Sequence, residues 1–188
     1  MDINLSLYER INLLNQYTIL QELSYIQNDG HNAKHYETIA NIIANGYTHE
    51  YGMLTDCMSD EFPETEAQFV WDTLEMYSAI LLSYHNIENP ELTYDQILFP
   101  GFDGNNETQY LYYCEFVLQD MGRYGELSEN NRKDFNSHCR KCDKYRAMLK
   151  KWNEMDKPHE MNHSQLKELL NIYWAKSHFI IIKFLHLK

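Results

Sequence analysis

A chain of 188 residues is long enough to bury a hydrophobic core, and by length it favours one domain with room for small subdomains. With 7 Gly, 4 Pro and 4 Cys, the composition argues against turn-rich sheets and a disulfide framework, and favours long helices in a reducing cytoplasm. No segment approaches the roughly 20 apolar residues of a membrane-spanning helix, and no signal-peptide pattern opens the chain, so we expect no membrane association.

The charge is divided unevenly along the chain. Residues 1–131 contain 3 of the 16 Lys and Arg and 22 of the 28 Asp and Glu, which gives them a net charge of −19, whereas residues 132–188 carry +7. Such an asymmetry bears on partners and self-association more than on the fold. The total of −12 opposes binding to a polyanion.

The first fifty residues predict a helical hairpin. Ser6 and Glu9 have the spacing of a capping box, and apolar residues then return at helical intervals until the turn residues 28–30. A second amphipathic helix is expected next and should end at Asn45-Gly46. A short helix is expected over residues 48–57.

The longest apolar segment follows Pro63 and predicts a central helix. Between Phe69 and Tyr84 almost no polar face is left, and a helix that is apolar nearly all round is a buried one. Asp72 and Glu75 form a narrow stripe on it. They could serve as a paired acid and base, but solvation or hydrogen bonds to neighbouring donors are the ordinary explanation.

Turn residues separate two further helical segments. Thr93 and Gln96 fit the capping box of a brief turn. A Gly- and Asn-rich segment follows, and we expect one of Asp103, Asn105 or Asn106 to cap the next helix. The predicted inward stripe of that helix consists of Tyr110, Tyr113, Phe116, Val117 and Met121.

A helix within residues 142–155 combines an apolar face with a cationic one. Its apolar face consists of Cys142, Tyr145, Met148, Leu149, Trp152 and Met155. The candidate interaction residues are the cations on and near its polar side, namely Arg140, Lys141, Lys144, Arg146, Lys150 and Lys151. The chain ends on a β-branched and aromatic segment, 179–185, which is typical of a strand that pairs when exposed, although a helix that begins near Asn162 could continue through it.

Several short motifs follow one another in a specific order. They are Glu9-Arg10, Asn15-Gln16-Tyr17, Asp72-Thr73-Leu74-Glu75-Met76-Tyr77, Gly101-Phe102-Asp103 with Glu107, Asn136-Ser137-His138, and Tyr145-Arg146-Ala147-Met148-Leu149 before Trp152. Together they resemble the YfbU family over about residues 5–172. The resemblance implies an all-α, multihelical array in which an N-terminal helical hairpin packs on a larger helical part around a buried central helix. The family is of uncharacterised function, so the resemblance implies no activity and no site residues.

Three parts of the chain are expected on this basis. Residues 1–58 form the hairpin, residues 59–172 form the larger helical part, which is compact with the hairpin, and residues 173–188 form a hydrophobic C-terminal extension past the usual end of the family. Arg140 stands where members of the family tend to have Pro before the Tyr-Arg helix. Both features are particular to this chain.

One motif resembles the metal site of zinc peptidases. His159-Glu160-Met161-Asn162-His163 fits the H-E-x-x-H pattern, in which two His one helical turn apart hold zinc and the Glu activates water. However, Asn162 and Gln165 have capping-box spacing, so we expect the helix to begin inside the motif and to leave His159 outside it. No third ligand is evident, and a zinc hydrolase that uses His159, Glu160 and His163 is therefore a remote alternative.

Two other groups have the residue types of a site but an ordinary structural explanation. Cys139 and Cys142 form a C-x-x-C beside His138, and cationic neighbours would lower the pKa of a thiol, yet Cys142 falls on an apolar stripe and no second Cys pair exists. His31 and His35 stand one turn apart without an adjacent acidic or Cys partner, which favours a surface pair. Phosphate loops, dinucleotide motifs and serine nucleophile motifs are absent from the sequence, so we expect no cofactor.

Two functional hypotheses remain. The first is a non-catalytic interaction protein that forms homo-oligomers or meets another protein, with its acidic N-terminal part contacting the basic C-terminal helices of the same or another copy. The second is nucleic-acid binding through the six cations, with Tyr145 or Trp152 stacking on bases. The net charge and the apolar position of these aromatic residues favour the first hypothesis.

Overall fold

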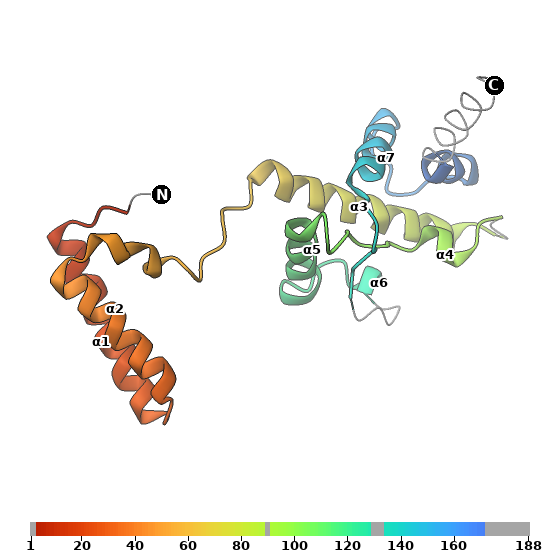
Figure 1. The fold of residues 1–188 in the computed structure, drawn as a ribbon. Coiled ribbons are helices and arrows are strands. Elements are labelled where there is room, and N and C mark those ends of the chain that lie inside the picture. The colour runs from red at the N-terminus through yellow and green to blue at the C-terminus, as the bar shows by residue number, and fades with distance from the viewer. Residues whose placement is uncertain (1–2, 89–90, 129–133, 172–188) are drawn as a thin grey trace, which may run out of the picture. The chain divides into compact units, whose positions relative to one another are not determined.

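The computed structural model describes residues 3–88, 91–128 and 134–171 (Figure 1). Regular structure within these ranges is helical, and β pairing is limited to one isolated bridge between Phe102 and Asn136. The predicted all-α class is therefore confirmed. The chain divides into two compact units, one of which ends at Glu61 while the other begins at Phe62. The expected hydrophobic extension over residues 173–188 lies outside the described residues.

The first unit is the predicted hairpin of α1 (Leu7–Ile26) and α2 (Gly30–Asn45), followed by the 3₁₀ helix η1 (Thr48–Leu54). Ser6 and Glu9 form the predicted capping box of α1. Gly46 adopts the left-handed conformation that ends α2. Arg10 joins the two helices, because its guanidinium donates to the carbonyl oxygens of Ile43 at 2.9 Å and Ala44 at 2.8 Å. Arg10 thus satisfies the Ala44 carbonyl at the end of α2 and adds a second donor to that of Ile43, which also accepts from the Gly46 amide.

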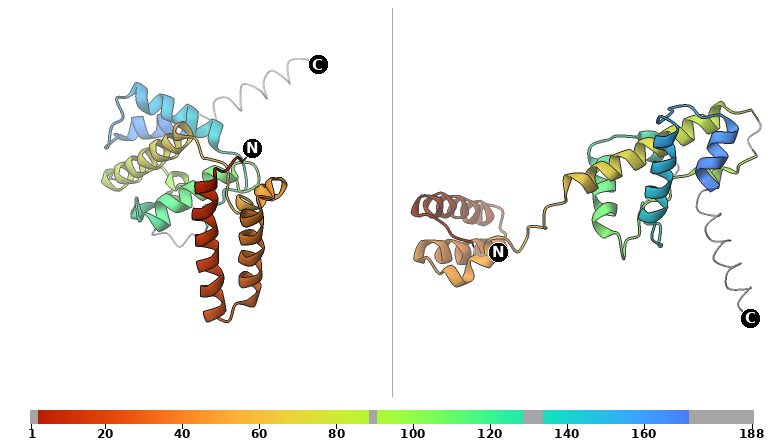
Figure 2. Two further views of the ribbon diagram at one scale, coloured as in Figure 1. Left: turned by 90° about the vertical axis from the view of Figure 1, so that its left-hand side faces the viewer. Right: turned by 90° about the horizontal axis from the view of Figure 1, so that it is seen from above.

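The second unit is organised around α3 (Glu64–Asn86), which is the predicted buried central helix. Its buried side chains include Val70, Leu74 and Ile80, each with no exposed surface. The helices α5 (Thr108–Glu115) and α7 (Cys142–Glu154) lie on opposite sides of α3 (Figures 1 and 2). A helix covered on several sides needs the nearly continuous apolar surface that its sequence shows.

The segment after α3 was predicted only in part. The capping box of Thr93 and Gln96 begins α4 (Tyr94–Ile97), as expected. The N-cap of α5 is Glu107, and no side chain caps that helix, so the prediction that Asp103, Asn105 or Asn106 would cap it was wrong. The carboxylate of Asp103 instead accepts hydrogen bonds from the backbone amide of Asn105 and from the side-chain amide of Asn106, within the turn before the helix.

The predicted inward stripe of α5 is confirmed in part, because Val117 is buried and Tyr110 and Tyr113 pack half-buried against the core. The buried residues of α5 and the following π-helix η2 (Phe116–Asp120) are Leu111, Cys114, Val117 and Leu118. Phe116 and Met121 are 46% and 43% exposed. Tyr110 and Tyr113 lie at the rim of the core, because their hydroxyls bond Glu66 and the Trp71 indole. Tyrosine favours such rims because its hydroxyl needs a polar partner.

The remaining helices are α6 (Gly125–Ser128), α7, and helical residues 163–171. The buried face of α7 consists of Tyr145, Met148, Leu149 and Trp152, while Cys142 and Met155 are half-buried at its ends. The indole of Trp152 donates to the carbonyl oxygen of Pro158 at 3.1 Å, which holds the turn after α7. Across the described ranges, no helix combines the length and apolar character that crossing a membrane requires.

Candidate functional site

The motif segments of the second unit meet at one junction, where residues 101–107 and 135–142 run side by side. The Phe102 amide donates to the carbonyl oxygen of Phe135, and the Ser137 amide donates to that of Phe102, both at 2.9 Å. Gly101 has φ +84°, and a Cβ there would lie 1.6 Å from the Phe135 carbonyl oxygen. Only glycine fits this close approach of two backbones.

Glu107 is the acceptor at the centre of this junction. Its buried carboxylate accepts hydrogen bonds from the Asp103 amide at 3.0 Å and from the amides of Lys141 and Cys142 at 2.8 Å each. The last two donors begin α7, so Glu107 caps that helix from 34 residues away in sequence. Sequence reasoning singled out Glu107 but did not find this role, because no local pattern marks a cap supplied by a distant residue.

Two buried tyrosines connect the junction to the central helix. The Tyr145 hydroxyl donates to the Gly101 carbonyl oxygen at 2.6 Å, and its ring packs edge-on against Tyr77 at 5.6 Å between centroids. Burial raises the pKa of both phenols well above the ordinary value, so both stay neutral. The motif residues gathered here therefore help to position α3 and α7.

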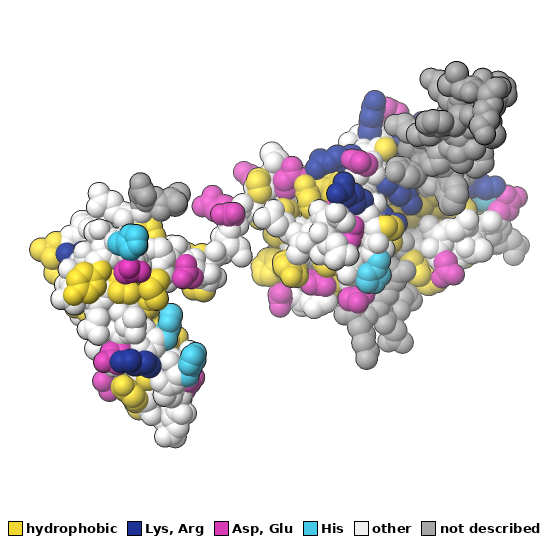
Figure 3. Space-filling model, in the orientation of Figure 1, with side chains coloured by type: hydrophobic (Ala, Val, Ile, Leu, Met, Phe, Trp, Pro, Cys, Tyr) yellow, Lys and Arg dark blue, Asp and Glu magenta, His cyan; other side chains and the backbone are white. Residues whose placement is uncertain are grey.

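The six candidate cations lie on the side of the second unit that carries α7, where Figure 3 shows Lys and Arg gathered. Arg146 bonds Glu66 at 2.9 Å and lies 4.2 Å above the Phe69 ring. Lys151 pairs with Glu168 and Arg140 donates to Asn106. Much of this charge is thus matched by polar groups of the same unit.

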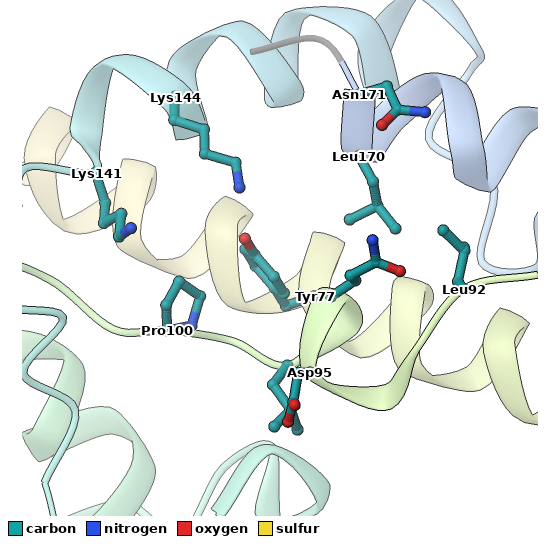
Figure 4. Close-up of a pocket in the computed structure, with 10 residues that line it drawn as sticks. Tyr77, Leu92, Asp95, Pro100, Lys141, Lys144, Leu170 and Asn171 are labelled. Atoms are coloured by element: carbon teal, nitrogen blue, oxygen red, sulfur yellow. The ribbon is translucent and has the colours of Figure 1, made fainter. Parts of the chain in front are cut away.

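Lys141 and Lys144 differ from the other cations, because they line a pocket of about 430 Å³ (Figure 4). Within the described ranges, neither ammonium has a carboxylate oxygen within 4 Å. Burial, together with the neighbouring charge of Lys141, lowers the pKa of Lys144. The pocket is completed by Tyr77, Leu92, Asp95, Gln96, Leu98, Pro100, Leu170 and Asn171.

The structure places the two histidines of the H-E-x-x-H pattern in different environments. Asn162 and Gln165 form the predicted capping box, with both hydrogen bonds at 3.0 Å, and the helix begins at His163. His159 is exposed and lies before the helix. The two imidazoles therefore do not share a helical face, and no group of three possible ligands occurs among the described residues.

The other candidate groups have structural surroundings. Burial and the Glu107 carboxylate raise the pKa of the Cys142 thiol to about 12, the opposite of the lowering that cationic neighbours would cause. Cys139 is exposed and unpaired, and His31 and His35 are exposed on α2. Asp72 accepts from Gln68 at 3.0 Å and lies 3.6 Å from the Lys157 ammonium, which agrees with a partnered surface carboxylate.

Sequence reasoning missed an apolar surface on α1. Among the described residues, 15 large hydrophobic side chains are exposed, and 8 of them lie on this one helix: Leu7, Tyr8, Ile11, Ile19, Leu20, Leu23, Tyr25 and Ile26. The opposite face of α1 packs on α2 through Leu13, Leu14 and Tyr17. The apolar periodicity located the helix, but a helix with two apolar faces does not reveal which face packs inward.

Comparison with known proteins gives one consistent result. The model of the YfbU domain matches residues 3–172. A UPF0304 protein of Methanocaldococcus jannaschii is 33% identical over 177 residues, which cover 89% of this chain and 99% of the relative. A UPF0304 protein of Pasteurella multocida is 31% identical over 164 residues, which cover 87% of this chain and 96% of that relative.

Proposed function

The chain belongs to the YfbU family, and we propose that it is a non-catalytic helical interaction protein that self-associates through the outer face of α1. This family has no characterised function, so the proposal is supported by the surface of the molecule. The observation that carries it is the apolar outer face of α1, which the first unit leaves exposed. Large exposed apolar patches on soluble proteins mark interaction sites.

The apolar residues of the outer face recur with helical spacing. Tyr8, Ile11, Ile19, Leu23 and Ile26 are 46–77% exposed and recur three, four, seven or eight residues apart on the side away from α2. Asn12 and Asn15 interrupt the stripe, and Glu22 is its only charged neighbour on that side of the described helix. A face with so little charge fits an apolar partner better than an ionic one.

A second copy of the same helix is the partner that fits this pattern. An antiparallel pairing about a twofold axis sets Tyr8 opposite Ile26, Ile11 opposite Leu23, Asn12 opposite Glu22, and Asn15 opposite Ile19. Each apolar residue except Ile19 then meets an apolar residue, and each Glu22 faces an amide instead of another carboxylate. The two faces are self-complementary, as a twofold interface requires.

The basic helix is a weaker candidate for the same role. The expectation that acidic and basic parts of different copies meet depends on cations that lack partners, whereas Arg146 and Lys151 bond carboxylates of their own unit. The role of the six cations as interaction residues stays a prediction. Nucleic-acid binding through these cations also stays a prediction. Salt separates the possibilities, because ion pairs weaken with ionic strength and apolar contacts do not.

The test is the size of the full chain in solution, measured by sedimentation velocity across micromolar concentrations. We expect a dimer that persists in about 1 M NaCl, since little charge lies in the proposed interface. The substitution Leu23→Arg places an unpaired charge in that interface and should raise the dissociation constant by about 100-fold or more. Leu82→Arg is the matched control, because Leu23 and Leu82 are 46% and 45% exposed and Leu82 lies in the second unit.

Three outcomes would contradict the proposal. A wild-type chain that stays monomeric at these concentrations would show that α1 does not pair with a second copy. A dimer that dissociates in high salt would favour the pairing of acidic and basic parts. Equal effects of Leu23→Arg and Leu82→Arg would place the interface elsewhere.

A further inference from the structure

The pocket beside α7 has two chemically different ends. Lys141, the residue before α7, and Lys144 on α7 lie at one end, with Lys144 directed toward Tyr77 (Figure 4). Leu92 and Leu170 lie at the other end, contributed by the segment before α4 and by the helical residues 163–171. These residues come from separate parts of the second unit, so the fold, rather than one local segment, creates the pocket.

The cationic end lacks an anion among the described residues. Two lysines line this end of the pocket, and the pKa of Lys144 is lowered by burial and by the Lys141 charge. Charges that are partly withdrawn from water are ordinarily paired. Asp95 is the carboxylate of the pocket lining, but it is exposed, lies away from Lys144 (Figure 4) and makes no ion pair with either lysine.

The Glu107 carboxylate does not fill this role. It accepts from the backbone amides of Lys141 and Cys142, so its oxygens are turned toward the backbone at the start of α7. The side chain of Lys141 is not held by Glu107 through an ion pair and lines the pocket. The same glutamate that fixes the helix start thus also fixes where the two lysines project.

We propose that this pocket binds a small anionic amphiphile, a molecule with one phosphate or carboxylate joined to a short apolar chain or ring. The anionic group would contact Lys141 and Lys144, and the apolar part would lie along Leu92, Leu98 and Leu170. A pocket of about 430 Å³ lies within the range of small-molecule sites, about 300–1,000 Å³. The site is independent of the α1 surface.

The probe for this site is hexyl phosphate, titrated into the full chain by calorimetry and by ¹H–¹⁵N NMR. Inorganic phosphate and hexanol are the control ligands, because the first has only the anionic part of the probe and the second has only its apolar chain. We expect hexyl phosphate to bind at least about ten-fold more tightly than either half, because the two ends of the pocket act together. The shifted amides should belong to the pocket lining and not to α1.

Two matched variants test the role of the cation. Lys144→Met keeps the apolar stem and removes the charge, and it should weaken hexyl phosphate binding by about ten-fold. Lys150→Met removes the same charge from an exposed position of α7 outside this pocket, and it should change binding less than about two-fold. Circular dichroism of both variants checks that the helices are retained.

Several results would overturn the proposal. Hexyl phosphate that produces no heat and no shifts would show that the pocket is not a ligand site. Equal weakening by Lys144→Met and Lys150→Met would indicate a general effect of net charge. Shifts confined to α1, or hexanol binding as tightly as hexyl phosphate, would indicate apolar adsorption without recognition of the anion.

Discussion

The two units of this protein use similar helices in different ways. In the second unit, α3 turns its apolar residues inward, and 26 buried hydrophobic residues form one core around it. In the first unit, the core cluster has four buried residues, Ile39, Ile42, Ile43 and Tyr51, while the outer face of α1 is left exposed. Both helices are apolar on more than one face, but only α3 has neighbours of its own unit on those faces.

This difference bears on the proposed self-association. A unit with a large core and a hydrogen-bonded junction can hold its structure from its own contacts. A two-helix hairpin buries little surface and gains from contact with another apolar face. We therefore expect the second unit to respond to changes in its junction and the first unit to respond to changes in concentration.

The largest effect is expected for Gly101→Ala at the junction. A Cβ would lie 1.6 Å from the Phe135 carbonyl oxygen, and the residue has φ +84°. The free energy of unfolding of the second unit should fall by about 4 kcal/mol or more. Urea denaturation followed by tryptophan fluorescence measures it, since all 3 Trp lie after Glu61.

The control for this change is Gly125→Ala, where a Cβ would meet nothing within 4 Å. Its effect should stay within about 0.5 kcal/mol. If both alanine variants unfold at the same urea concentration, the close approach of the two backbones does not govern the stability of this unit.

Removal of the distant helix cap should have the next largest effect. Glu107→Ala leaves the amides of Lys141 and Cys142 without their acceptor, and the free energy of unfolding should fall by about 2–3 kcal/mol. Glu115→Ala, at the end of the helix that Glu107 precedes, should change it by less than about 0.5 kcal/mol, because the Glu115 side chain makes no hydrogen bond within the described part of the chain. A smaller loss for Glu107→Ala than for Glu115→Ala would contradict the capping role.

Dilution should lower the stability of the first unit but not that of the second, and this effect should be smaller than those of the two substitutions above. If α1 pairs with a second copy, each ten-fold dilution destabilises the dimer by about 1.4 kcal/mol. Circular dichroism of the helices should then show a thermal transition whose midpoint temperature falls on dilution. The midpoint measured by tryptophan fluorescence, which reports on the second unit, should not change. A helical signal that is independent of concentration would remove this difference between the units.

The smallest effect is expected from acid. The Tyr110 hydroxyl and the Arg146 guanidinium lower the pKa of Glu66 below its ordinary value of 4.5. A lowered pKa in the folded state stabilises the fold above the unfolded value, and this contribution is lost as the pH falls through 4.5 and below.

The measurement compares the wild type with Glu66→Gln. Because the Glu66 side chain is 31% exposed, its contribution should be below about 1 kcal/mol. The advantage of the wild type in unfolding free energy should decrease between about pH 6 and about pH 3. An advantage that grows in acid would mean that Glu66 is not held as a carboxylate.

The fold was predictable wherever the signal was local. Capping boxes at Ser6, Thr93 and Asn162 each mark a helix start, because the residues that satisfy the first amides lie three positions apart. The capping box at Asn162 also correctly predicted that the helix begins after His159 and includes His163. The buried character of α3 followed from its apolar pattern, since the residues between Phe69 and Tyr84 leave almost no polar face.

What the sequence did not reveal depends on distant contacts. Phe116 was expected inside on the same stripe as Val117, but the buried side of α5 and η2 includes Leu111 and Cys114, and Phe116 is exposed. The pocket was not predictable either, since Lys144 and Leu170 meet only in the folded chain. Lys141 and Lys144 were recognised as candidate interaction residues by their charge. They differ from Arg146 because Arg146 forms an ion pair with Glu66, a contact that only the folded structure reveals.

The Glu107 contact also has a consequence for the order of assembly. Glu107 and Lys141 are 34 positions apart, so the intervening chain must close before the first turn of α7 gains its acceptor. The chain loses conformational entropy when this loop closes, before the distant contact can stabilise the fold. We therefore expect α7 and the 101–107 turn to become ordered in a single cooperative event, late on the folding pathway.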